Sequence, residues 1–547
     1  MAHHHHEHHH SHHPHHGGCA LVNAESGAVV HSGLEAHYYV VNEAPAAAAN
    51  AAYASATGTA AAPLPKAVWS MGASTLKVPM ALHAETRAKL VDYYRAHFHA
   101  KENTDAVVLL EGGKLQHQYD TDREMLFRQE SFFMYLFGVT DPDCYAALDI
   151  RSGESTLFVP ELDPSYAIWE GVIHPQEYFR IKYEVTHVRF VNELKWWFGL
   201  RNPEHGVHVL TGVNSDSKSV VPPANFDGLS EFKVDSSFLH AALSECRLIK
   251  TPKEIEVMRY VNKVSSDAHA RVMAACRPGM MEYQLESLFL HETYSMGGCR
   301  FAAYNCICGA GHSGATLHYG QNSKAIREND MMLLDMGAEY HGYVSDITRS
   351  YPANGKFSPN QRFIYETVRQ AQKAVMDAMR PGVKWTDMHL LAERTILEQL
   401  KAGGLLQGSV DEMIEACLGY VFMPHGLGHQ MGLDTHDVGG YRDASERSER
   451  PGLRNLRTNR VLAEGMVLTV EPGVYFVEHL LKKAFADPAQ SKFLVKSKLD
   501  EFRGFGGVRL EDDVLVTATG YENLTTVPVT IEEVEAIMAA GAKSRSA

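Results

Sequence analysis

Short apolar runs separated by turn residues, with longer amphipathic stretches between them, begin at Lys66 and continue along the chain. The runs AVVLLEGG, YAALDI and STLFVP start at residues 106, 145 and 155, and each has the length and punctuation of a strand. Residues 78–98, VPMALHAETRAKLVDYYRAHF, have the spacing of a helix. The pattern predicts an α/β or α+β domain over residues 66–247.

A strong helix start follows this region. Thr251 and Pro252 stand as N-cap and first helical residue before a long amphipathic stretch, TPKEIEVMRYVNKVSSDAHARVMAAC. We therefore expect a domain boundary at 247/248. A second domain of helices and glycine-rich strands is expected over residues 248–535, with a short tail at 536–547.

The first 65 residues differ from the rest of the chain. They contain no Lys or Arg, and they carry the broken run HHHHEHHHSHHPHH followed by an Ala-rich stretch. Low complexity and few large apolar side chains predict disorder over residues 1–65. The histidine run could chelate metal, and whether it is native or introduced stays open. Neither a signal peptide nor an Arg-rich transit peptide is indicated.

Composition narrows the class of protein. The 547 residues are 45% hydrophobic and 21% charged, which is typical of a globular protein, and no run of 18 apolar residues predicts a membrane span. The net charge of −15, with scattered basic residues, disfavours nucleic acid as a partner. The eight cysteines lack a zinc or disulfide pattern, so we expect reduced thiols and a cytoplasmic location.

Two aspartates interrupt an apolar hairpin pattern in MMLLDMGAEYHGYVSDITRSYP, residues 331–352. If the chain reverses at Tyr340 and His341, Asp335 and Asp346 become direct cross-strand partners with Cβ atoms roughly 5 Å apart. Two buried carboxylates at that distance repel unless a cation lies between them or one is protonated. A metal pair is one explanation, and an exposed hairpin with incidental acids is the other.

Further acids and histidines favour the metal. Glu471 ends the apolar run of GMVLTVEPGVYF, and Glu511 lies within that of GFGGVRLEDDVLVT. In VFMPHGLGHQMGLDTHDVGGY, His425, His429 and His436 lie four and seven residues apart. The glycines between the first two disfavour the helix of an H-E-x-x-H zinc site and favour a strand or loop. As few as one of these histidines would then be a ligand, the others serving hydrogen bonding, proton transfer or structure.

Five of these blocks, LHYG, DMGAEYHGYVSDITRSYP, FMPHGLGHQMGLDTHDVGGY, LTVEPGVYF and GFGGVRLEDD, resemble in order and spacing the metal-binding blocks of the pita-bread metallopeptidases. Other segments, among them TLKVPMALHAETR, FRQESFFMYLFGV and CICGAGHSGATLHYG, resemble the eukaryotic prolidases within that family. The resemblance covers about residues 67–535. It implies an α+β protein, in which an N-terminal α/β domain of the creatinase/prolidase type precedes a pita-bread catalytic domain.

The resemblance also implies a dinuclear metal site. Its ligands would be Asp335, Asp346, His429, Glu471 and Glu511, with Asp346 and Glu511 bridging the ions. Four carboxylates balance the four charges of two divalent ions, and an oxygen-rich shell with one imidazole favours Mn²⁺, although Zn²⁺, Co²⁺ or Fe²⁺ would also bind.

Catalytic and substrate-binding roles follow from the same resemblance. Glu471 would move a proton, and His436 and His318 would donate hydrogen bonds to the substrate and the developing oxyanion, with His425 beside them. Arg457 and Arg509 would hold a substrate carboxylate, since a guanidinium matches two oxygens, and both can instead be structural arginines. Tyr304 would line the pocket.

The activity so implied is that of an Xaa-Pro dipeptidase, which hydrolyses the imide bond of dipeptides ending in proline or hydroxyproline. A homodimer is implied as well. One rival is an Xaa-Pro aminopeptidase of the same fold. Others are a non-catalytic pita-bread protein that binds ribosomes, RNA or chromatin, and a metal-free carbon-nitrogen hydrolase, both of which the retained ligands oppose.

Overall fold

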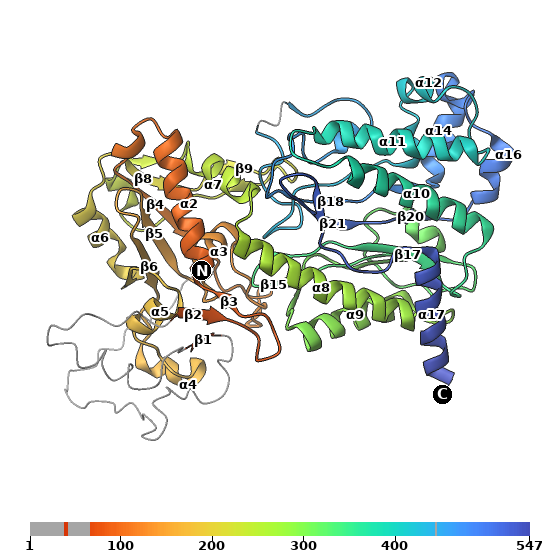
Figure 1. The fold of residues 1–547 in the computed structure, drawn as a ribbon. Coiled ribbons are helices and arrows are strands. Elements are labelled where there is room, and N and C mark those ends of the chain that lie inside the picture. The colour runs from red at the N-terminus through yellow and green to blue at the C-terminus, as the bar shows by residue number, and fades with distance from the viewer. Residues whose placement is uncertain (1–37, 42–65, 443–445, 547) are drawn as a thin grey trace.

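The computed structural model describes residues 38–41, 66–442 and 446–546, which form two lobes side by side (Figure 1). The predicted disorder of residues 1–65 lies outside the described residues, apart from β1 (Tyr38–Val41), which pairs with β2 (Lys66–Trp69). The predicted mixture of helices and strands in both halves is confirmed. Among the described residues no helix is both long and apolar enough to cross a membrane.

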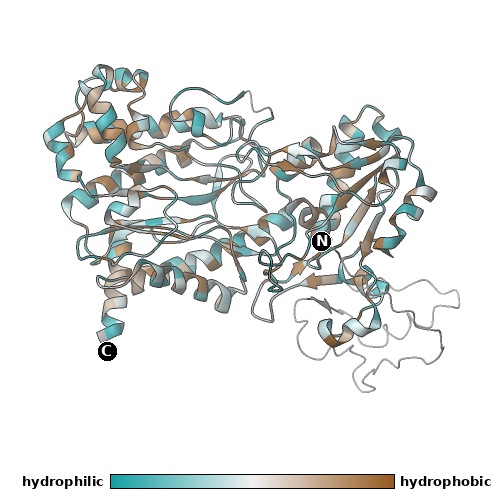
Figure 2. Ribbon diagram, turned by 180° about the vertical axis from the view of Figure 1, so that it is seen from behind, coloured by the Kyte–Doolittle hydropathy of each residue, from teal (hydrophilic) through white to brown (hydrophobic). Residues whose placement is uncertain are grey.

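The N-terminal lobe is built on a six-stranded mixed sheet in the order β11-β8-β4-β5-β6-β7. Its strands are β4 (Ala106–Glu111), β5 (Tyr145–Asp149), β6 (Ser155–Val159), β7 (His187–Phe190), β8 (Gly206–Val209) and β11 (Val234–Asp235). Along β4, Val108 and Leu110 pack on the face that α2 (Ala81–His97) and α3 (Ser131–Phe137) cover. Val107 and Leu109 pack on the opposite face with α6 (Leu194–Arg201). Both faces are buried, which explains the continuous apolar runs and the hydrophobic strands seen from behind in Figure 2.

The C-terminal lobe places short sheets between two layers of helices (Figure 1). One layer is α8 (Pro252–Ala275), α9 (Glu282–Gly297) and α17 (Ile531–Ser546), and the other is α10 (Pro359–Ala378) and α11 (Trp385–Ala402). The strands between them are β13 (Ile307–Ala310), β14 (Met331–Asp335), β15 (Ala338–Tyr340), β16 (Tyr343–Val344), β17 (Thr348–Pro352), β18 (Val467–Val470), β19 (Gly473–Tyr475), β20 (Gly507–Arg509) and β21 (Asp512–Val516).

The predicted start of α8 is confirmed in detail. The hydroxyl of Thr251 accepts from the backbone N–H of Glu254, and the Glu254 carboxylate accepts from the backbone N–H of Thr251. With Pro252 in the first turn, this capping box fixes where the second lobe begins to fold. The seven cysteines in the described part of the chain are unpaired, and six of them are buried.

The predicted register of the aspartate hairpin is wrong by two residues. The turn consists of His341 and Gly342, both at positive φ (49° and 81°), so Tyr340 pairs with Tyr343. Two residues at positive φ form the tight turn that suits the twist of a hairpin, and the reversal is therefore one residue later than expected. In the paired strands Asp335 lies opposite Thr348 rather than Asp346.

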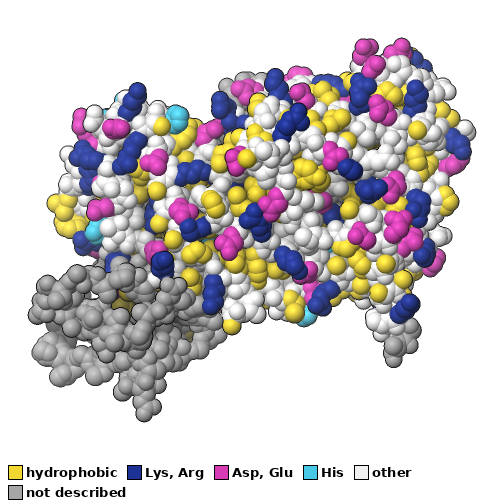
Figure 3. Space-filling view, viewed as in Figure 1, with side chains coloured by type: hydrophobic (Ala, Val, Ile, Leu, Met, Phe, Trp, Pro, Cys, Tyr) yellow, Lys and Arg dark blue, Asp and Glu magenta, His cyan; other side chains and the backbone are white. Residues whose placement is uncertain are grey.

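The surface shows mixed charge on the face seen in Figure 3. Basic and acidic side chains are interspersed over both lobes there, and neither sign gathers into an extended patch. This face therefore lacks the basic stripe that a nucleic acid backbone requires.

A buried histidine pair joins the lobes. His83 of α2 donates through Nδ1 to the carbonyl of Tyr135, and its Nε2 lies 2.9 Å from Nε2 of His341 in the hairpin turn. His341 also packs on the ring of Trp69. Burial lowers the pKa of His83 to about 3 and also lowers that of His341, so the pair is neutral.

This pair predicts acid sensitivity of the fold. The pKa of His83 is lower in the folded than in the unfolded chain, so its contribution to stability is complete above pH 6.5 and is lost as the pH falls toward 3. Replacing His83 by Gln removes one group that takes up a proton when the protein unfolds in acid. Between pH 6.5 and 5 the variant should lose about 2 kcal/mol less stability than the parent. Urea unfolding at a series of pH values measures this, and equal pH slopes would contradict it.

Candidate metal centre

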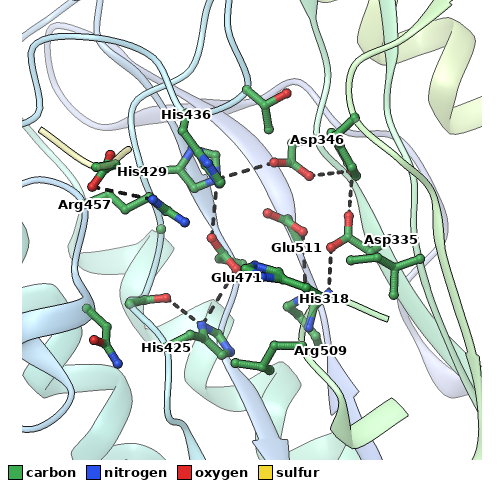
Figure 4. A pocket seen from close by; sticks show the side chains of 18 of the residues that line it. His318, Asp335, Asp346, His425, His429, His436, Arg457, Glu471, Arg509 and Glu511 are labelled. Carbon is green, nitrogen blue, oxygen red and sulfur yellow. Dashed lines mark hydrogen bonds and ion pairs between the residues drawn. The ribbon is translucent and has the colours of Figure 1, made fainter. Parts of the chain in front are cut away.

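A cavity of about 860 Å³ opens where the sheets of the C-terminal lobe meet the N-terminal lobe. All five predicted metal ligands line it, and Figure 4 shows them turned toward one another. Each comes from a strand end or from the chain next to one: Asp335 from β14, Asp346 from between β16 and β17, His429 from the loop before β18, Glu471 from between β18 and β19, and Glu511 from between β20 and β21.

Tyr304 joins the two aspartates. Its hydroxyl lies 2.6 Å from Oδ1 of Asp335 and 2.6 Å from Oδ1 of Asp346. The two carboxylates thus meet, as expected, in spite of the shifted register. Tyr304 does line the cavity, but its hydroxyl is directed at the candidate ligands.

His429 is held as a metal-binding histidine should be. Its Nδ1–H donates to the carbonyl of Gln430 at 3.0 Å, which leaves Nε2 free, 3.4 Å from Asp346 Oδ2 and 3.5 Å from Glu471 Oε1. The loop is not helical, as predicted. Gly428 explains this local fold, because a Cβ at that position would lie 2.0 Å from the carbonyl oxygen of Thr469.

The donor set fits divalent cations. Ligand atoms of Asp346, His429 and Glu511 all lie within 4.8 Å of one another. Three carboxylates are buried here and that of Glu471 is partly buried, all beside one arginine, Arg509, and Glu511 is only 2% exposed. Burial and then the neighbouring carboxylates raise the pKa of Glu511 well above its usual range, and burial raises that of Glu471 to about 7. Two divalent cations would reduce the repulsion among these carboxylates.

Arg509 is buried beneath the ligands and makes several hydrogen bonds. Its guanidinium donates to Oδ2 of Asp335 at 2.7 Å, to the Tyr475 hydroxyl at 2.7 Å and to Oγ1 of Thr348 at 3.1 Å. The hydroxyl of Tyr475 lies 2.9 Å from Nε2 of His425, whose Nδ1–H donates to Gly426. Burial, with the charge of Arg509, lowers the pKa of His425 to about 3, so this ring is neutral.

The remaining predicted residues line the same cavity. His318, His436 and Arg457 all line it, and His436 packs edge-on against the ring of His429. Sequence reasoning missed Tyr475, which lay inside a quoted block, and Asp216 of the N-terminal lobe, which no nearby pattern marks.

Comparisons with known proteins agree with this geometry. Residues 256–518 match the model of metallopeptidase family M24, and residues 83–205 match the N-terminal domain of aminopeptidase P. The chain therefore belongs to metallopeptidase family M24, whose members depend on divalent metal ions, and has the pita-bread fold expected for it.

Particular relatives narrow the comparison. The chain is 53% identical to the Xaa-Pro dipeptidase of Homo sapiens, over 86% of this chain and 95% of that protein. It is 36% identical to a probable Xaa-Pro aminopeptidase of Botryotinia fuckeliana, over 82% and 95%. Among solved structures, the aminopeptidase PepP of Pseudomonas aeruginosa has a TM-score of 0.69 and 33% identity, covering 86% of this chain and all of that one.

The centre predicts stabilisation by metal. Mn²⁺ added to metal-free protein should raise the melting temperature, because two cations relieve the repulsion among the carboxylates. At a free concentration 100 times the Kd the gain is about 2.7 kcal/mol. Glu511→Gln should lose most of this gain, whereas the same change at exposed Glu328 should not. Calorimetry with and without Mn²⁺ tests this, and an unchanged response of Glu511→Gln would count against the site.

Proposed function

We propose that this protein is an Xaa-Pro dipeptidase that hydrolyses the imide bond of dipeptides ending in proline or hydroxyproline. The observation that supports it most is the meeting, in one cavity, of an acidic ligand set with an arginine whose donors are available to a carboxylate. The 53% identity to the human dipeptidase over most of both chains supports the same activity.

Two divalent ions would be held by Asp335, Asp346, His429, Glu471 and Glu511, and this oxygen-rich shell favours Mn²⁺. Asp346, His429 and Glu511 would share in holding them, because their ligand atoms lie within 4.8 Å of one another. When bound, the ions supply Lewis acidity toward the scissile carbonyl and the attacking water.

Glu471 is the proton carrier in this proposal. Its Oε1 accepts from Thr469 at 3.3 Å, while Oε2 lies 3.8 Å from Nδ1 of His425 and faces the cavity. Oε2 can therefore take a proton from water and pass it to the imide nitrogen of the leaving proline.

Three histidines orient the substrate. His436 and His318 donate hydrogen bonds to the substrate and to the developing oxyanion, a contribution of about 2.7–4 kcal/mol for one good donor. His425 stands beside them as a neutral ring fixed by Tyr475.

The two arginines have different roles in this proposal. Arg457 binds the carboxylate of proline, since its side chain is 29% exposed toward the cavity. Arg509, only 4% exposed, acts on substrate by fixing Asp335, and Tyr304 likewise sets the spacing of Asp335 and Asp346.

Further features of the protein belong to the same proposal. A homodimer is supported by exposed apolar side chains in α4 (Ala167–Glu170), where Ile168 and Trp169 are 79% and 82% exposed. The unpaired thiols of the described residues support a cytoplasmic location. The domain limits we propose are 66–247 and 248–546. The tail expected at 536–547 is replaced by α17, because Val534 and Met538 of this helix are buried against Val272 and Met273 of α8. We expect neither nucleic acid nor membrane as partners.

Loss of one candidate metal ligand tests the chemistry. Asp346→Asn should reduce Gly-Pro hydrolysis by more than the roughly 100-fold that loss of an outer-shell partner costs. The assay uses Mn²⁺-reconstituted enzyme, with circular dichroism to confirm folding. If folded parent and variant are equally inactive, the peptidase assignment fails.

An Xaa-Pro aminopeptidase is the second candidate. The 36% identity to the Botryotinia fuckeliana relative and the similarity to the PepP structure favour it. Hydrolysis of Gly-Pro compared with Gly-Pro-Gly separates the two activities, because only a dipeptide has a free carboxylate directly on the proline.

Arg457→Ala should erode the preference for dipeptides more than the chemical step. Loss of charge-assisted hydrogen bonds to the carboxylate should raise KM for Gly-Pro about tenfold to 100-fold and leave kcat nearly unchanged. Steady-state kinetics on Gly-Pro and Gly-Pro-Gly measure both effects. A variant that loses kcat but keeps KM would show that Arg457 does not bind the carboxylate.

A further inference from the structure

A hairpin of the N-terminal lobe reaches into the cavity of the C-terminal lobe. It consists of β9 (Gly212–Val213) and β10 (Val220–Val221), and its tip contributes Ser215, Asp216 and Lys218 to the cavity lining. Oδ1 of Asn214 accepts from the backbone N–H groups of Asp216 and Ser217, both at 2.9 Å. This turn fixes the backbone from which Asp216 projects.

Asp216 contacts two arginines of the C-terminal lobe. Its Oδ1 accepts from Nη2 of Arg447 at 2.8 Å and lies 3.5 Å from Nη1 of Arg457. The side chain of Asp216 is 15% exposed, and those of the arginines are 21% and 29% exposed. Water screens this cluster less than a surface ion pair, so the carboxylate effectively offsets the mutual repulsion of the two guanidinium groups.

The two arginines differ in how many of their N–H donors are already used within the protein. Arg447 is engaged through both terminal nitrogens: besides Asp216 it donates to the carbonyls of Leu456, Arg454 and Ser215. The guanidinium of Arg457 has no hydrogen-bond partner among the described residues. Its one ion pair there is the 3.5 Å contact with Asp216. Figure 4 shows its guanidinium beside His436, on the cavity side. Its forked donors can therefore take a second carboxylate.

We propose that Asp216 is a specificity-determining positioning residue, which holds Arg457 where it receives the free carboxylate of a C-terminal proline. The hairpin tip lines the same cavity as Arg457. Preference for dipeptides is thus set jointly by an arginine of one lobe and an aspartate of the other. This inference rests on the proposed dipeptidase function.

The test isolates the effect of the substrate's terminal charge by comparing two substrates of equal length. Gly-Pro carries the carboxylate, and Gly-Pro-amide has nearly the same shape without the charge. Asp216→Asn should raise KM for Gly-Pro about fivefold to tenfold with kcat within about twofold, and should leave Gly-Pro-amide unaffected. The preference for Gly-Pro falls by the same factor. Asp216→Glu, which keeps the charge, should restore most of that preference.

Two further variants exclude a merely structural effect. Ser217→Ala alters the same exposed tip without lining the cavity, and it should keep parental kinetics. In an Arg457→Ala background, Asp216→Asn should add almost nothing, because it acts through that arginine. Melting temperatures confirm folding, and Asp216→Ser, judged by the same substrate ratio, replaces the Asn variant if that variant does not fold.

The outcomes are distinct. A parent enzyme that does not hydrolyse Gly-Pro removes the proposed function and this inference with it. A parent active on Gly-Pro, with an Asp216 variant that keeps the full preference over the amide, overturns this inference alone. An Asp216 effect that persists undiminished without Arg457 overturns it as well.

Discussion

Repulsion among four carboxylates, three of them buried and one partly buried, is the constraint on which the catalytic lobe depends. Asp335, Asp346, Glu471 and Glu511 line one cavity, and in the part of the chain that the structure describes Arg509 is the one arginine whose side chain pairs with these carboxylates. Such a group is unfavourable in an apolar interior unless cations or protons compensate it. The side chains of the lobe therefore leave a net negative charge in the cavity. Divalent cations would balance this charge, which agrees with membership of a metallopeptidase family.

Several neighbours have no direct part in the chemistry and still determine its geometry. Tyr304 spaces the aspartates, Arg509 and Tyr475 orient Asp335 and His425, and Gly428 lets the loop of His429 approach the next strand. Each of these groups acts through hydrogen bonds or close packing rather than through charge alone. A site held in this way is preorganised, so little rearrangement is needed when substrate enters.

The two lobes share the site. The loop that carries His436 is anchored by Asp434, which accepts from Arg247 at 2.9 Å and from Ser131 at 2.6 Å, and by Asp437, which also pairs with Arg247. Ser131 and Arg247 belong to the N-terminal lobe, as does the hairpin of Asp216. The N-terminal lobe therefore contacts both the loop that carries His436 and the side chain of Arg457 in the other lobe.

Periodicity and turn residues were enough to predict the strands at 106–111, 145–149 and 155–159, the capped start of α8 and the non-helical loop around His429, because these depend on neighbours in the sequence. The resemblance of five blocks supplied the ligand set. The hairpin register was missed, because positive φ at His341 and Gly342 is a property of the folded turn. The partners of Arg509 and the reach of Asp216 to Arg457 were decided by tertiary structure alone: they join residues 174 and 241 positions apart, a separation at which sequence spacing carries no information about distance.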